Sequence, residues 1–287
     1  MRAAATAAAL LQGDTMIRKL YPGGKARAFN ISYDDGVVQD IRFVKLLNRY
    51  GLKGTFNLNY GLMRRNFTWE HECGMTIHRI PEDQVVAVYE GHEIASHSYS
   101  HPYFDHASET EILKELGADQ FFLERLFGGK VAGYATPFYY YSDLMADCVR
   151  HCGFEYARIS EESNDYSVPA DFYRWRGSKF HWDDDLEDFV RGFLKSDREL
   201  ALCQLVGHSY DLDVLELWDR MERICTWIRD NGDVWPATHL ELVRYLRAMD
   251  CARISDREIS NDSNAVLWFA VDGTTVKLQP GEKITLV

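Results

Sequence analysis

The sequence has no CxxC cysteine pair, no run of basic residues and no apolar stretch of the roughly 18 residues that a membrane span requires. Its charge is strongly acidic, with 32 Lys and Arg against 44 Asp and Glu and a formal net charge of −12. Such a surface repels phosphate backbones and anionic lipid headgroups. We therefore expect neither nucleic acid nor a membrane among the partners of this protein.

The cysteines are scattered and lie in periodic apolar segments. They are Cys73, Cys148, Cys152, Cys203, Cys225 and Cys251. Cys148 and Cys152 flank a histidine, but their spacing is more typical of one helix face than of a metal site. We interpret all six as reduced thiols that are mostly buried.

The first fifteen residues, MRAAATAAALLQGDT, are rich in Ala and Leu and contain a single Arg. This segment is similar to a weak signal peptide but lacks a clear cleavage pattern before Met16. An equally good interpretation is that translation starts at Met16 and that residues 1–15 are a disordered or spurious extension. We expect a cytoplasmic protein, with secretion as the alternative.

Strand-like and helix-like segments alternate along most of the chain. The expected strands are 28–33, 52–58, 93–98, 131–136, 154–159, 171–176 and 200–206, and the expected helices are 39–50, 81–91, 109–126, 142–152, 185–195, 214–230 and 238–249. Repeated βα units predict parallel strands with helices outside, either closed as a barrel or open as a doubly wound sheet.

The pattern changes near the end of the chain. From Ala265 onward, apolar and polar residues alternate around an Asp272-Gly273 turn, which predicts a hairpin and a further strand. With 287 residues, of which 46% are hydrophobic, the chain can form one large domain and a small appendage. We expect an extension at 1–15, the main domain at 16–250 and a β-strand appendage at 251–287.

Unusual side chains gather at the carboxyl ends of the expected strands. They are Asp34 and Asp35, Asn57 and Asn59, His97 and His101, Pro137 and Phe138, and His208. In α/β folds, the loops at this edge converge and form the functional site. Adjacent side chains alternate in a regular strand, but in a turn before Gly36 both carboxylates can point the same way.

Two close carboxylates raise each other's pKa unless a cation lies beside them. The segment SHSYSHP supplies His97 and His101, and two imidazoles with one carboxylate form a common open metal site. The His spacing alone is weak evidence. The placement of both pairs on neighbouring strand ends is what predicts a metal site.

The segments SYDDG, SHSYSHP, TPFY and LVGHSYD occur in this order and resemble the polysaccharide deacetylase family (NodB homology, carbohydrate esterase family 4) over about residues 26–250. The resemblance implies a distorted, incomplete (β/α) TIM-like barrel and a carbohydrate substrate. It implies that Asp34 is the general base and that Asp35, His97 and His101 bind a divalent metal, usually zinc, although Co²⁺, Ni²⁺ or Mn²⁺ can serve. Trp182, in a loosely matching stretch, would line the substrate groove.

The chemistry of such a set follows from its residue types. A bound metal activates water and polarises a carbonyl, and Asp34 would take the proton of that water. A backbone N–H near Phe138, in a loop stiffened by Pro137, is a candidate donor to the oxyanion. His208 is the candidate acid for the leaving amine, oriented by Asp211 or Asp213.

Three positions depart from the family pattern, and one of them is Phe138, which replaces the Tyr of the third motif. Ala135 stands where the family often has an Arg that pairs with the base. Tyr33 replaces the commoner Phe, which predicts a mild change of packing only. We expect a metal-dependent hydrolase that removes N-acetyl or O-acetyl groups from sugars. The alternatives are a hydrolase of small cyclic amides or ureides and a non-catalytic carbohydrate-binding relative, and pocket depth would separate the first two.

Overall fold

The computed structural model describes residues 15–286. The strands of its main sheet are β2 (Arg27–Asp34), β3 (Thr55–Leu58), β6 (Glu93–Ser96), β7 (Gly133–Ala135), β8 (Tyr156–Glu162), β9 (Trp175–Gly177), β10 (Lys179–Phe180), β11 (Ala201–Gly207) and β12 (Val234–Pro236). The α-helices are α1 (Asp40–Tyr50), α2 (Tyr60–Arg64), α3 (Glu82–Val88), α4 (Glu109–Phe127), α5 (Asp143–His151), α6 (Leu186–Lys195), α7 (Asp211–Val214), α8 (Trp218–Asp230) and α9 (His239–Asp250).

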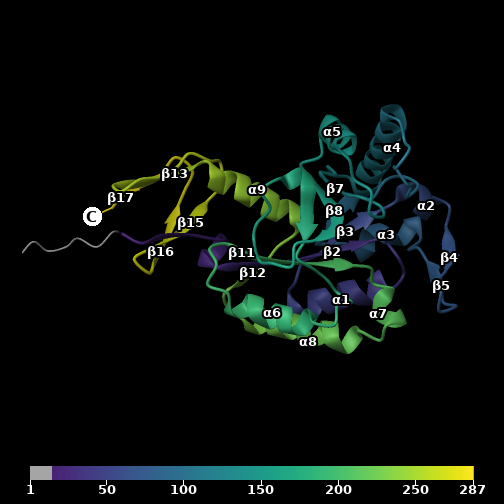
Figure 1. The fold of residues 1–287 in the computed structure, drawn as a ribbon, viewed down its shortest axis with the longest axis horizontal. Helices are drawn as coiled ribbons and strands as arrows, with labels where there is room; N and C mark the ends of the chain where they lie inside the picture. Colours follow the sequence, from purple (N-terminus) through teal and green to yellow (C-terminus); the bar gives the residue numbers. More distant parts are fainter. Residues whose placement is uncertain (1–14, 287) are drawn as a thin grey trace, which may run out of the picture.

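The main sheet has the strand order β10-β11-β2-β3-β6-β7-β8-β9, and β12 also pairs with β2. Its strand pairs are parallel. The sheet curls into a nearly closed barrel, because β9 pairs with β8, β10 pairs with β11, and only Ser178 separates β9 from β10. Helices lie outside it, with α4 and α5 on one side and α1, α6 and α8 on another (Figure 1). The expected distorted (β/α) barrel is confirmed.

Local signals explain where several elements begin and end. The Ser108 hydroxyl accepts a hydrogen bond from the Glu111 N–H and the Glu111 side chain accepts from the Ser108 N–H, which starts α4 with a capping box. Gly128, with φ +70°, ends the same helix in a left-handed conformation that glycine adopts without strain. Strand β2 is buried from Ala28 to Asp34, as expected for a strand at the centre of a barrel.

Three expectations about local structure were wrong. The expected helix at 214–230 begins only at Trp218, as α8, and the separate short helix α7 ends at Val214, because Glu216 takes a left-handed φ of +54° between them. The expected strand at 171–176 begins as a 3₁₀ helix (Phe172–Arg174) and becomes extended only at Trp175. The cysteines are not mostly buried as expected. Cys73, in a hairpin turn, and Cys251, at the end of α9, are exposed, and Cys152 is half-buried. Cys148, Cys203 and Cys225 are buried, and all six thiols are free.

A β-rich segment lies next to α9, at one end of the molecule (Figure 1). It consists of β13 (Ala252–Ile254), β14 (Glu258–Asn261), β15 (Leu267–Val271), β16 (Thr274–Leu278) and β17 (Lys283–Thr285), and β15 and β16 form the expected hairpin. The N-terminal strand β1 (Ile17–Leu20) pairs antiparallel with β15. This pairing was not predicted, because the two strands lie at opposite ends of the sequence. Phe269 and Leu278 pack in one buried cluster with Leu242 of α9.

A second hairpin, β4 (Thr68–Glu70) and β5 (Thr76–His78), was not predicted and lies at the opposite end of the molecule from the C-terminal strands (Figure 1). Within residues 15–286, no helix combines the length and apolar character needed to cross a membrane. The expected extension at 1–15 falls outside the described residues except for Thr15.

Candidate active site

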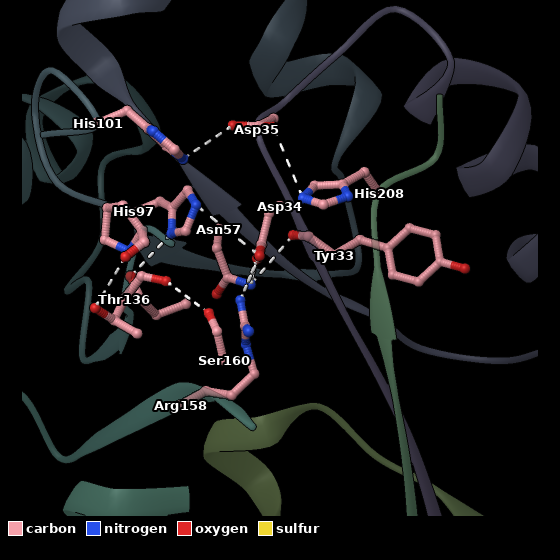
Figure 2. A network of polar contacts seen from close by, with 12 residues as sticks. Tyr33, Asp34, Asp35, Asn57, His97, His101, Thr136, Arg158, Ser160 and His208 are labelled. Carbon is pink, nitrogen blue, oxygen red and sulfur yellow. Dashed lines mark hydrogen bonds and ion pairs between the residues drawn. The ribbon is translucent and has the colours of Figure 1, made fainter. Parts of the chain in front are cut away.

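The two adjacent aspartates lie where β2 ends. Asp34 is the last residue of the strand, and Asp35 follows with a left-handed φ of +82°. This turn breaks the alternation of side chains, so both carboxylates lie within one cluster of polar residues (Figure 2). Non-glycine residues in this conformation are strained and are found preferentially at functional sites.

Asp35, His97 and His101 form a compact set of donor atoms. Each offers one ligand atom, and these atoms lie within 4.8 Å of one another. The Nδ1–H of His97 donates to the carbonyl of Ala135 at 2.9 Å, which leaves Nε2 free to face the site. One carboxylate and two imidazoles are a donor set that fits a divalent first-row metal.

The protonation states of these residues also suit a cation. Burial lowers the pKa of His97 to about 4 and also lowers the pKa of His101, so both imidazoles are neutral at pH 7. Burial alone would raise the pKa of Asp35, but the Arg79 guanidinium and the nearby imidazoles outweigh it and lower that pKa. A negative carboxylate therefore faces two neutral ring nitrogens.

The carboxylate of Asp34 is held by an arginine that the sequence did not predict. Nη2 of Arg158, on β8, contacts both carboxylate oxygens of Asp34, with Oδ2 at 2.5 Å (Figure 2). Asn57 donates to Oδ1 of the same carboxylate at 2.7 Å. Arg158 is only 1% exposed, and its backbone is the direct strand partner of Ala135. The arginine missing at position 135 is therefore replaced from the neighbouring strand.

The charge state of Asp34 depends on this contact. Burial would raise its pKa, but Arg158 and the imidazole of His97 lower it below the ordinary value. Nε2 of His97 lies 3.9 Å from Oδ2 of Asp34, so the base candidate stands directly beside the donor cluster. Asp34 is therefore an ionised acceptor at neutral pH.

His208 lies on the other side of the donor cluster, with Nε2 3.9 Å from Oδ2 of Asp35. Its Nδ1–H donates to Oδ2 of Asp211 at 2.9 Å, whereas Asp213 accepts from the indole of Trp218. The sequence left these two aspartates open, and the hydrogen bond identifies Asp211 as the partner of His208.

Asp211 also accepts a hydrogen bond from a second histidine. Nε2 of His181 lies 3.2 Å from Oδ2 of Asp211, and the hydroxyl of Tyr33 donates to Nδ1 of His181. His181 is completely buried. The expectation that Tyr33 changes only the packing was therefore wrong, because its hydroxyl is the first member of a relay that ends at His208.

This environment favours the protonated form of His208. Burial lowers its pKa, but the hydrogen bond to Asp211 and the charges of Asp35, Asp211 and Asp34 together raise the pKa to about 9. The imidazole can therefore carry a proton at neutral pH, as a general acid must.

A cavity of about 570 Å³ opens above these groups. Its lining includes Asp34, Asp35, His97, His101, Arg158 and His208, together with Phe138 and Trp182. Phe138 has φ +54°, and its ring meets the imidazole of His101 edge to face at 4.5 Å. Pro137, which precedes Phe138 in the loop at the edge of the cavity, is buried and does not line the cavity.

One signal in the sequence could have revealed Arg158. It is the single charged residue in the buried stretch YARI at the start of β8, and a buried charge requires a partner. Which carboxylate it pairs with depends on the register of β7 against β8, which periodicity alone does not supply.

Comparisons with known proteins agree with this geometry. Residues 23–157 match the family model described as polysaccharide deacetylase. A structure from Mycobacterium smegmatis assigned to the polysaccharide deacetylases has 17% identity and a TM-score of 0.63, over 81% of this chain and 94% of that one. A variant of peptidoglycan deacetylase PdaC from Bacillus subtilis has 16% identity and a TM-score of 0.51, over 80% and 96%.

A carbohydrate esterase family 4 pseudoenzyme from Bacillus anthracis has 16% identity and a TM-score of 0.50, over 79% of this chain and 68% of that one. No curated protein sequence gives a significant match. At these identities the structural likeness shows the fold, while the family model spans Asp34, Asp35, His97 and His101. Residues 23–157 of this barrel are therefore similar to polysaccharide deacetylase domains of the NodB-homology type, carbohydrate esterase family 4, a family of hydrolases that act on amide bonds.

Proposed function

We propose that this protein is a metal-dependent hydrolase that removes acetyl groups from N-acetylated or O-acetylated sugars of an oligo- or polysaccharide. The observation that carries the proposal is the placement of Asp34 and His208 on two sides of the same donor cluster. Oδ2 of Asp34 lies 3.9 Å from Nε2 of His97, and Nε2 of His208 lies 3.9 Å from Oδ2 of Asp35. A base and an acid thus flank one position where an acetyl group can react.

Asp35, His97 and His101 would hold the metal, with zinc as the first candidate and Co²⁺, Ni²⁺ or Mn²⁺ as the others. When bound, such a metal lowers the pKa of a water molecule and polarises the acetyl carbonyl. The remaining steps depend on residues of the chain itself.

Asp34 would accept the proton of the attacking water. Arg158 and Asn57 fix the orientation of its carboxylate, and Arg158 also lowers its pKa and so keeps it ionised. His208 would donate its proton to the leaving nitrogen, or to the leaving oxygen of an ester. A backbone N–H near Phe138, at the lip of the cavity, is the proposed second donor to the oxyanion.

The alternative of a non-catalytic relative is favoured by Ala135, because the family often has an arginine there that pairs with the base. Arg158 removes that argument, because it makes the contact to the base from the adjacent strand. A saccharide also suits the aromatic lining of the cavity, since Phe138 and Trp182 offer apolar faces to the C–H groups of a sugar ring.

The test is acetate release by the zinc-loaded protein from N-acetylated oligosaccharides and acetylxylan, with small cyclic ureides assayed for ring opening. Asp34→Asn is run in parallel, with its bound zinc measured. Acetate release that is lost in Asp34→Asn, while zinc stays bound, supports the proposal and names the sugar class. Ureide hydrolysis alone would move the assignment to the small-molecule alternative, and no turnover by zinc-loaded protein would contradict the proposed catalysis.

A further inference from the structure

One wall of the cavity comes from outside the barrel. Phe67 and Trp69, on and next to β4, line the cavity together with the barrel residues. Trp69 is the antiparallel partner of Ile77, which is fully buried, so this face of the hairpin turns toward the protein. Phe67 nevertheless remains 45% exposed. An exposed aromatic side chain at the edge of a binding cavity is available for a ligand.

Aromatic contacts connect Trp69 of the β4–β5 hairpin to His208. The ring of Trp69 meets Tyr210 edge to face at 5.6 Å, and the ring of Tyr210 stacks on the imidazole of His208 at 4.8 Å. The ring of Trp182 is also nearly parallel to the imidazole of His208, with the ring centres 6.0 Å apart. A row of rings therefore leads from the proposed acid to the hairpin, and a ligand that reaches His208 can extend along it.

The hairpin is held firmly against the loop that carries Asp35. The N–H of Val38 donates to the carbonyl of His78 at 2.9 Å, and the N–H of Ile80 donates to the carbonyl of Gly36 at 2.9 Å. Arg79 contacts the backbone carbonyl of Asp35, and its Nη2 lies 3.2 Å from Oδ1 of the same residue.

Arg79 also links the loop to the aromatic wall. Its guanidinium carbon lies 5.3 Å from the centre of the Trp69 ring. The indole is therefore held at a set position relative to the donor cluster, which is what a binding subsite requires and what a loosely attached loop would not supply.

The size of the cavity indicates more than one ring. Its volume of about 570 Å³ falls in the range of about 300–1,000 Å³ that encloses a drug-sized ligand. An acetyl group at the donor cluster would occupy only the floor of this space. The lining of the remainder includes the rings of Phe67, Trp69 and Tyr210, whose flat faces suit the C–H groups of a saccharide.

We propose that Phe67 and Trp69 form a second sugar-binding subsite, in which the ring adjoining the reacting sugar stacks on the β4–β5 hairpin. This inference rests on the proposed function and deepens it, because it makes the substrate an oligosaccharide of at least two rings. The hairpin then determines specificity for chain length without taking part in the chemistry.

The test compares the wild type with Trp69→Ala on N-acetylglucosamine oligomers of one to four rings. We expect KM to rise roughly tenfold for two rings or more, on the scale of one lost stacking contact. KM for the single ring and kcat for all lengths should stay unchanged. Trp69→Phe should restore most of the affinity. Phe121→Ala, on α4 and 52% exposed outside the cavity lining, is the matched control.

Binding is measured separately by calorimetric titration of Asp34→Asn, with and without Trp69→Ala, using the four-ring oligomer. Weaker binding of the oligomer in the double variant supports the subsite even if the wild type releases no acetate, a result that would contradict only the proposed catalysis. Equal affinities with and without Trp69→Ala, or a KM change that is the same for one ring and four, would overturn the subsite. A fall in kcat at every length would also overturn it, because Trp69 would then act through Tyr210 on His208.

Discussion

Nη2 of Arg158, on β8, donates to both carboxylate oxygens of Asp34 at the end of β2. The backbone of Arg158 lies directly opposite Ala135 on β7. The guanidinium therefore reaches Asp34, the proposed base, from the strand next to the one where the family pattern often has its arginine. Ala135 and Arg158 lie directly opposite each other across a parallel strand pair, so an arginine at either position starts from the same level of the sheet. The role of the contact can be tested by removing the arginine from position 158 and by placing one at position 135.

Arg158→Ala should lower kcat/KM about a hundredfold or more, on the scale of a general base that has lost its orientation and charge state. Removing one partner of a buried ion pair should also cost about 3–5 kcal/mol of unfolding free energy. The pKa of Asp34 should rise, so the acidic limb of the pH–rate profile should move to higher pH. Kinetics and denaturant unfolding measure these effects.

Adding Ala135→Arg to Arg158→Ala should recover part of the lost activity and stability, because the two positions are strand partners. Arg176→Ala removes an exposed arginine of β9 that pairs with Glu161, and it serves as the control. An Arg158→Ala protein with wild-type kcat/KM would show that the contact has no role in the reaction.

Asp211→Asn should change the pH dependence of activity. The hydrogen bond and the charge of Asp211 raise the pKa of His208, and that raised pKa keeps the acid protonated at alkaline pH. Without the carboxylate the pKa falls, so the alkaline limb of kcat/KM should move to lower pH, with little change near pH 6. Asp213→Asn, whose carboxylate accepts from Trp218, is the matched control. Identical alkaline limbs in the two variants would rule out Asp211 as the partner that matters.

Tyr33→Phe removes one hydroxyl from the relay that leads through His181 to Asp211. Nδ1 of buried His181 loses its donor, and we expect a loss of about 1 kcal/mol in the free energy of unfolding. We also expect a severalfold fall in kcat, because Asp211 is held less firmly beside His208. Tyr21→Phe removes another buried hydroxyl, which donates to the carbonyl of Leu200 far from the cavity. Equal stability losses with no effect on kcat in either variant would make the relay purely structural.

Zinc should stabilise the wild type. A ligand that binds only the folded state adds about 2.7 kcal/mol at a hundred times its dissociation constant. We therefore expect the Tm to rise with added zinc and to fall with a chelator. His97→Ala should abolish the rise, since it removes one of three donors within 4.8 Å. His106→Ala, whose side chain is exposed, should keep it. A zinc-dependent Tm that survives in His97→Ala would place the metal elsewhere.

Much of the site could be predicted because its main residues are close together in the sequence. Asp34 and Asp35 are adjacent, and His97 and His101 lie within five residues, so strand periodicity places both pairs at carboxyl ends of strands. The expectation that these strands are neighbours was wrong, because β3 lies between β2 and β6. The capping box of α4 and the hairpin around Asp272 were equally local and equally predictable. The alternation of strands and helices predicted a parallel sheet but left a barrel and an open sheet as alternatives, and the family resemblance implied the barrel that the structure has.

Contacts between segments far apart in the chain could not be predicted in this way. Arg158 lies 124 residues from Asp34, and Tyr33 lies 148 residues from His181, so the register of several strands decides whether these pairs meet. Sequence alone determined which side chains follow the strand ends, because that depends on residue types and local periodicity. Tertiary structure decided which arginine contacts Asp34, which aspartate accepts a hydrogen bond from His208 and that a hairpin forms one wall of the cavity, because those relationships exist only once distant strands pair.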